Sequence, residues 1–149
     1  MPSTSKNSKT TPPKKGLIFA VTQKGKDEIF GVIAKDDVTV GPMNDAFLVY
    51  LFKPAIKDIA AQHDMIDVNS LYLPPIITDI SPWKKGLFQA MGAAPQLPRL
   101  DSIAPTFKHP LNSRLFTLDG VPTDVESPLT GEWAVWTHTG IKEMLEGEL

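Results

Sequence analysis

One uninterrupted apolar segment, residues 46–52, restricts the fold of this chain more than any other feature of its sequence. The segment reads AFLVYLF, with no alternation between apolar and polar side chains. A strand of this kind needs cover on both faces, and Pro54 ends it because proline cannot donate to a sheet ladder. We therefore predict a central strand packed between two layers.

Two further β-rich runs precede this strand. Residues 16–22 and 29–34 are separated by a charged segment that contains glycine, which predicts a hairpin. Gly31, inside the second run, indicates a bulge or a close approach of the backbone to another segment. A weaker strand signal covers residues 38–40, and residues 41–45 are typical of a turn.

The middle of the chain changes in character. Apolar residues recur at three- and four-residue spacing within residues 55–65, which predicts one short helix. Residues 71–79 look like a strand interrupted by Pro74 and Pro75, and this interruption predicts an edge strand or a bulged corner.

The last third contains one long segment without a clear pattern. Residues 82–110 are rich in proline, glycine and alanine, and we expect an irregular stretch that packs over the domain or meets a partner. Residues 113–118 and 133–137 predict two more strands, the first followed by a turn. Residues 140–149 predict a short amphipathic helix.

These elements define the expected fold class. Six or seven short strands, one short internal helix and a C-terminal helix indicate an α+β fold with a mainly antiparallel, curved sheet or half-open barrel. A chain of 149 residues suffices for one core, so we assign residues 16–149 to a single globular domain. Residues 1–15 hold no apolar side chain beyond Met1, and we expect them to form a disordered basic leader.

Charge is divided unevenly between these two parts. Residues 1–15 carry four lysines and no acid, which leaves 11 bases and 17 acids, a net charge of −6, in residues 16–149. An acidic body repels phosphates and attracts a basic protein. Direct nucleic-acid binding is therefore disfavoured, and a basic protein is the expected partner.

Localisation follows from the apolar segments. None approaches the ~20 residues of a membrane span, and residues 1–15 lack the apolar core of a secretory signal. The sequence contains no cysteine, so disulfides and thiolate metal sites are excluded. We expect a cytoplasmic protein that does not bind membranes.

Enzymatic chemistry would have to use oxygen and imidazole groups. His63, His109 and His138 lie far apart and show no metal-ligand spacing, although a zinc site that joins them to Asp79 or Asp119 stays open. A Ser-His-Asp set also stays open, because the order of its members varies among folds. A small hydrolase or metal-dependent enzyme is therefore the alternative hypothesis.

The local motifs do not favour that alternative. The sequence holds neither a G-x-S-x-G nucleophile elbow nor a glycine-rich phosphate loop. We therefore expect no cofactor and a function other than catalysis.

Two features predict a protein-binding surface. Residues 119–132 carry four acids, Asp119, Asp124, Glu126 and Glu132, with no base among them. Trp83 lies in an irregular segment and is a candidate aromatic anchor, although a tryptophan folded down over the mouth of the half-open barrel is the alternative. The acids near residues 36–37 and 45 are a second candidate surface.

The order of segments resembles the immunity protein 26 family. The resemblance is carried by GLIFAV (16–21), IFGVI (29–33), LVYLF (48–52), LPPIITD (73–79), residues 83–92, LDG (118–120) and AVW (134–136) with residues 141–145. It implies a small non-enzymatic protein that protects a bacterium by binding its own polymorphic toxin, in contact-dependent competition. The expected partner is the C-terminal domain of that toxin.

Overall fold

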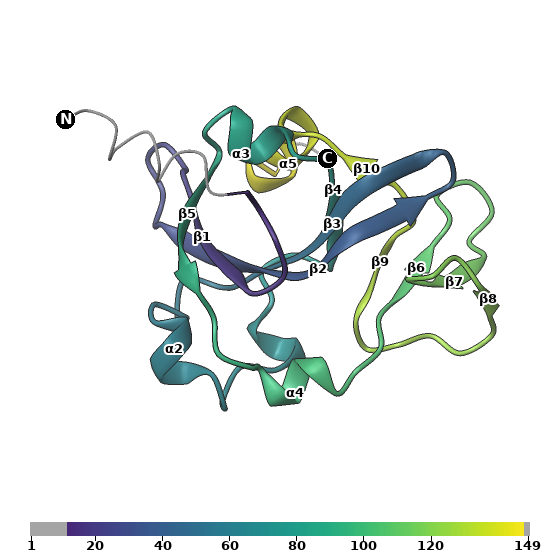
Figure 1. Cartoon of the computed structure of the whole chain (residues 1–149), viewed down its shortest axis with the longest axis horizontal. Helices are drawn as coiled ribbons and strands as arrows, with labels where there is room; N and C mark the ends of the chain where they lie inside the picture. Colours follow the sequence, from purple (N-terminus) through teal and green to yellow (C-terminus); the bar gives the residue numbers. More distant parts are fainter. Residues whose placement is uncertain (1–11, 148–149) are drawn as a thin grey trace.

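The computed structural model describes residues 12–147, which form two sheets and four α-helices (Figure 1). The larger sheet has six strands in the order β10-β4-β3-β2-β1-β5, and the smaller has four in the order β8-β7-β6-β9. Both sheets are mainly antiparallel; β10 pairs with β4, and β9 with β6, in parallel. The predicted α+β class with an open, mainly antiparallel sheet is confirmed, and the sheets do not close into a barrel.

The elements have the following bounds. The strands are β1 Leu17–Val21, β2 Ile29–Val40, β3 Met43–Leu51, β4 Ile76–Thr78, β5 Phe88–Ala93, β6 Thr106–Lys108, β7 Leu115–Thr117, β8 Pro122–Thr123, β9 Thr130–Glu132 and β10 Val135–Trp136. The α-helices are α2 Ile59–Gln62, α3 Ser81–Lys84, α4 Pro98–Asp101 and α5 His138–Leu145, and Val68–Ser70 form a 3-10 turn.

The predicted central strand is confirmed as β3. It lies between β2 and β4, and its side chains alternate between two buried clusters. Leu48, Tyr50 and Phe52 belong to one cluster, which also holds residues of α2, α4 and the smaller sheet. The other cluster holds Phe47, Val49 and Leu51 together with residues of α5.

Helices cover the larger sheet on both faces. In Figure 1, α3 and α5 lie on one side of the sheet and α2 and α4 on the other. The smaller sheet projects beside the second pair, and its buried Phe107 and Leu129 pack in the same cluster as β3. One core therefore joins both sheets.

Gly31 is required by this packing. A Cβ atom at residue 31 would lie 2.6 Å from Phe19 Cζ and 2.8 Å from Leu51 Cδ2. The close approach predicted from the sequence is confirmed.

Several expectations need correction. Residues 38–40 are not a separate strand, because β2 runs through Asp36 and Asp37 with three register shifts, and Asp37 has φ +55°. The segment that contains Pro74 and Pro75 is not an edge, because both prolines precede β4, which pairs on both sides.

The segment predicted to be irregular holds four elements. Residues 82–110 contain most of α3 and all of β5, α4 and β6. The helix predicted within residues 55–65 is limited to α2, and the C-terminal helix is α5.

The predicted leader is described only at its end. Residues 1–11 lie outside the described residues. The Lys14 carbonyl accepts a hydrogen bond from Leu17 N–H (3.1 Å), and Lys15 N–H donates to Asp36 Oδ2 (2.8 Å). These bonds join residues 14 and 15 to the larger sheet.

Candidate functional site

The smaller sheet carries all four of the predicted acidic site residues. Asp119 lies in the turn between β7 and β8, Asp124 and Glu126 follow β8, and Glu132 ends β9. All four are exposed. We call this surface, residues 119–126 together with Glu132, the acidic rim.

Turn chemistry positions the first part of the acidic rim. Gly120 has φ +82° and donates its N–H to the Thr117 carbonyl (2.9 Å), and Thr117 N–H donates to the Val121 carbonyl (2.8 Å). A glycine accepts this left-handed conformation without strain. The turn thus places Asp119 at the tip of the β7–β8 hairpin.

A hydroxyl network fixes the loop that carries Glu126. Thr106 Oγ1 and Thr130 Oγ1 lie 2.7 Å apart, and Ser127 N–H donates to Thr106 Oγ1 (3.0 Å). These hydrogen bonds connect the loop to both β6 and β9. Lys108 Nζ lies 3.8 Å from Glu126 Oε1, but both side chains are about half exposed, so this ion pair contributes little stability.

Exposed apolar side chains accompany the acids. Val121 is 56% exposed and Val125 75% exposed within the acidic rim, and Leu111, in the loop before β7, is 89% exposed. Sequence reasoning missed these residues. The sequence did contain a signal for the two valines. Both lie among turn and acidic residues that show no alternation of apolar and polar side chains, so a buried position in a core is not expected for them.

A groove opens beside the acidic rim. Its volume is about 460 Å³, and its lining includes Glu126, Glu132, His109 and Trp136. The His109 Nδ1 atom accepts a hydrogen bond from Leu111 N–H (3.1 Å), so the neutral ring carries its proton on Nε2. The structure therefore brings two of the four predicted acids to one concave site.

Trp83 is not part of this surface. It lies on α3, and its ring contacts Phe19, Phe47 and Phe88 with centroid distances of 5.5, 5.2 and 5.1 Å. Its Nε1 is buried and has no hydrogen-bond partner within residues 12–147. Trp83 thus covers the larger sheet, which is the alternative weighed from the sequence, and the expectation of an exposed anchor is corrected. A contact of Trp83 with a toxin stays a prediction.

The second candidate surface has structural roles. Asp36 Oδ2 accepts the Lys15 N–H, and Asp37 and Asp45 both have positive φ, at +55° and +59°. The pairing of Val38 with Ala46 places these acids on neighbouring strands, at the irregular part of the β2–β3 ladder.

The residues of the hydrolase alternative are bonded mainly to the backbone. His63 Nδ1 lies 2.9 Å from the Ala60 carbonyl oxygen of its own helix. Ser81 Oγ donates to Asp79 Oδ1 (2.6 Å) and accepts the backbone N–H of His138 (2.8 Å). Serine, aspartate and histidine therefore meet at the start of α3, but the serine proton points to the aspartate and the contact with His138 is through its backbone. In a Ser-His-Asp triad the imidazole takes the serine proton.

Residues 12–147 contain no group of three or more histidine, aspartate or glutamate side chains arranged to hold a metal ion. In the same range, no helix is long and apolar enough to cross a membrane.

The fold and surface define an α+β protein of two sheets with an acidic and apolar rim on the smaller one. No family model, curated protein or solved structure matches this chain. The resemblance to the immunity protein 26 family stays a prediction from the residues quoted above.

Proposed function

We propose that this chain is an immunity protein that neutralises a secreted bacterial toxin domain by binding it directly through the acidic rim. The observation that supports this proposal is the combination of four exposed carboxylates with two exposed valines on one small sheet. The family resemblance supports the same function.

The two kinds of side chain have different effects on binding. Exposed carboxylates of one sign attract a basic partner and accelerate association, an effect that salt screens. Apolar side chains that lose their water on binding slow dissociation. Val121 and Val125 supply the second effect within the same surface as Asp119 and Asp124.

The groove beside the acidic rim supports one position for this proposed contact. Its lining includes Glu126 and Glu132, with Trp136 as an aromatic surface and Lys108, which pairs with Glu126, as the one lysine of the described lining. A lysine or arginine side chain of the partner satisfies both features, because its charge pairs with a carboxylate and its stem or guanidinium packs on an aromatic ring. We therefore expect a basic side chain of the toxin to enter the groove.

The test is binding to the C-terminal toxin domain encoded by the neighbouring reading frame. We expect a one-to-one complex in calorimetry whose affinity falls as salt rises. The double variant Asp119→Lys/Asp124→Lys should slow association roughly tenfold at low salt and flatten the salt dependence, because steering accounts for factors of about 10–10³ in the on-rate.

A matched control separates the local surface from the net charge. Asp27→Lys/Glu28→Lys makes the same change of charge on exposed residues between β1 and β2, far from the smaller sheet in Figure 1. Equal slowing by both variants would show that only net charge matters and would remove the acidic rim from the interface. Absence of any complex at low salt would overturn the immunity function.

A further inference from the structure

A second concave site lies between the larger sheet and α4. Its volume is about 680 Å³, within the ~300–1,000 Å³ of small-molecule sites. The sheet supplies its base through Val32 and Leu48, and α4 and the end of β7 supply walls through Leu97 and Leu118. This cavity shares no lining residue with the groove beside the acidic rim.

Most of the lining is apolar. Besides the four residues above, the apolar lining includes Leu100, Ile103, Ala104 and Pro105. An apolar site of this size favours the hydrocarbon or aromatic part of a ligand, because such a part leaves water on binding.

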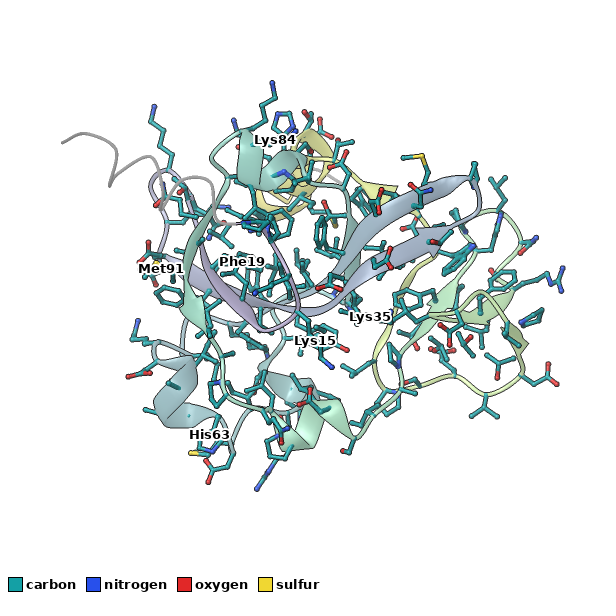
Figure 2. The ribbon with its side chains drawn as sticks, in the orientation of Figure 1. Lys15, Phe19, Lys35, His63, Lys84 and Met91 are labelled. Carbon is teal, nitrogen blue, oxygen red and sulfur yellow. The ribbon has the colours of Figure 1, made fainter. Side chains whose placement is uncertain are left out.

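Two lysines, Lys15 and Lys35, line the cavity. Lys15 precedes β1 and Lys35 lies in β2, and the hydrogen bond from Lys15 N–H to Asp36 holds the two segments together. Figure 2 shows both lysines next to one another in the middle of the molecule, between β2 and α4. Within residues 12–147, neither ammonium group forms an ion pair with a carboxylate.

The single acid of the lining has a structural partner. Asp101 Oδ2 accepts the backbone N–H of Leu97 (3.0 Å) at the start of α4. Lys35 Nζ lies 3.5 Å from the Asp36 carbonyl oxygen, which is an uncharged partner. Since neither lysine has a carboxylate partner among the described residues and Asp101 is engaged, the polar part of the cavity favours an anion.

Tyr50 adds a neutral donor at the base. Its side chain is 4% exposed and lines the cavity. Burial, and to a smaller extent the Asp101 carboxylate, raise the pKa of the Tyr50 hydroxyl well above its usual value. The phenol therefore keeps its proton at neutral pH and is available to donate a hydrogen bond to a ligand oxygen.

We propose that this cavity binds a small amphiphilic carboxylate, with its apolar part between β3 and α4 and its carboxylate beside Lys15 and Lys35. The proposal does not rest on the immunity function, since the cavity shares no lining residue with the groove beside the acidic rim. Because Leu118 directly follows β7 of the smaller sheet and Val32 lies in β2 of the larger sheet, the bound molecule would contact both sheets.

Octanoate is the probe for this site, with 1-octanol and octyltrimethylammonium as its neutral and cationic counterparts. We expect saturable one-to-one binding of octanoate with a Kd on the order of 1 mM or tighter, given the energy available to a ligand of this size. Methyl resonances of Val32, Leu48 and Leu118 should shift on titration. The alcohol and the cation should bind at least roughly tenfold more weakly, since neither can form the charge-assisted hydrogen bond that a carboxylate forms with an ammonium group.

Variants test each part of the site. Lys35→Gln should weaken octanoate binding roughly three- to tenfold, whereas Lys24→Gln, which removes the same charge in the exposed β1–β2 turn, should not change it. Ala104→Phe should fill the cavity from an exposed lining position and abolish binding without disturbing the core.

Three results would overturn the proposal: absence of saturable octanoate binding, equal affinity for octanol, or methyl shifts confined to residues outside the cavity. Binding of octanoate in the Ala104→Phe variant with unchanged affinity would also place the ligand elsewhere. None of these results depends on a toxin domain, so they leave the test of the proposed function separate.

Discussion

Tyr50 combines two structural roles at the scale of one residue. Tyr50 belongs to the buried cluster that joins the two sheets, and it also lines the cavity beside α4. Burial is the main cause of its raised pKa, and the Asp101 carboxylate acts in the same direction. Both effects disfavour the phenolate, so the folded state holds this proton more tightly than the unfolded chain.

This difference predicts a loss of stability in alkaline solution. The pKa of tyrosine in the unfolded chain is about 10. The contribution of Tyr50 to the free energy of unfolding is therefore complete below pH 10, and above this pH it declines by about 1.4 kcal/mol per pH unit. Urea unfolding at pH 9 to 11 should show a smaller decline in the free energy of unfolding for Tyr50→Phe than for the unmodified chain.

Tyr72 provides the control for this measurement. Its side chain is 40% exposed, and Tyr72→Phe should leave the alkaline decline unchanged. An equal effect of the two substitutions would show that burial of Tyr50 does not govern the alkaline behaviour.

At the scale of elements, prediction from the sequence succeeded where the side-chain pattern reports burial. β3 was predictable because both of its faces are buried, and α5 because Ile141 and Leu145 share a buried face. β5 was not, since of its six residues only Phe88 is buried and the others are exposed. Its pairing with β1 depends on backbone hydrogen bonds, which leave no trace in hydropathy.

The candidate site, too, was predictable only where the sequence pattern reports whether a residue is buried or exposed. The acidic residues were predictable because turn and acidic residues are solvated in any fold. The groove was not, because it brings the loop around Glu126 next to Pro75, which is far away in the sequence. The position of Trp83 could not be predicted, since a tryptophan that follows a proline is found both in interfaces and in short helices that cover a sheet.

The packing of α3 predicts what a substitution of Trp83 does. Trp83→Ala removes the ring that contacts Phe19, Phe47 and Phe88 and should lower the free energy of unfolding by about 2–4 kcal/mol. In the complex with a toxin, the association rate should stay unchanged, because Trp83 is remote from the acidic rim. Urea unfolding and stopped-flow binding measure the two effects.

Tyr72→Ala is the control, because it also removes an aromatic ring, but at an exposed position. It should lower the free energy of unfolding by less than about 1 kcal/mol. A Trp83→Ala protein of full stability that releases the toxin faster would restore the earlier expectation of an aromatic anchor.

At the scale of the whole molecule, one close contact joins the two sheets. Gly131 in β9 packs against the backbone carbonyl of Pro75, directly before β4, so closely that a Cβ atom would collide with it. The contact is between backbones, and neither side can move without distortion of its sheet. Gly131→Ala should therefore lower the free energy of unfolding by about 1–3 kcal/mol, the usual cost of overpacking.

Gly92→Ala serves as the comparison. Gly92 also lies in a strand, but no atom lies within 4 Å of its hypothetical Cβ, and alanine should be neutral or slightly stabilising there. Denaturant unfolding of both variants measures the difference. Equal stability of the two would show that the sheets are not held together at Gly131.

The parallel strands near the C-terminus also determine when the molecule can fold during its synthesis. Only Trp133 and Ala134 separate β9, which completes the smaller sheet, from β10, which pairs with β4 of the larger one. Both sheets therefore gain their last strand within a few residues of each other, after β1 to β8 have left the ribosome. Until then the edge of β4 and the face later covered by α5 are open, which makes the nascent chain a target for chaperones.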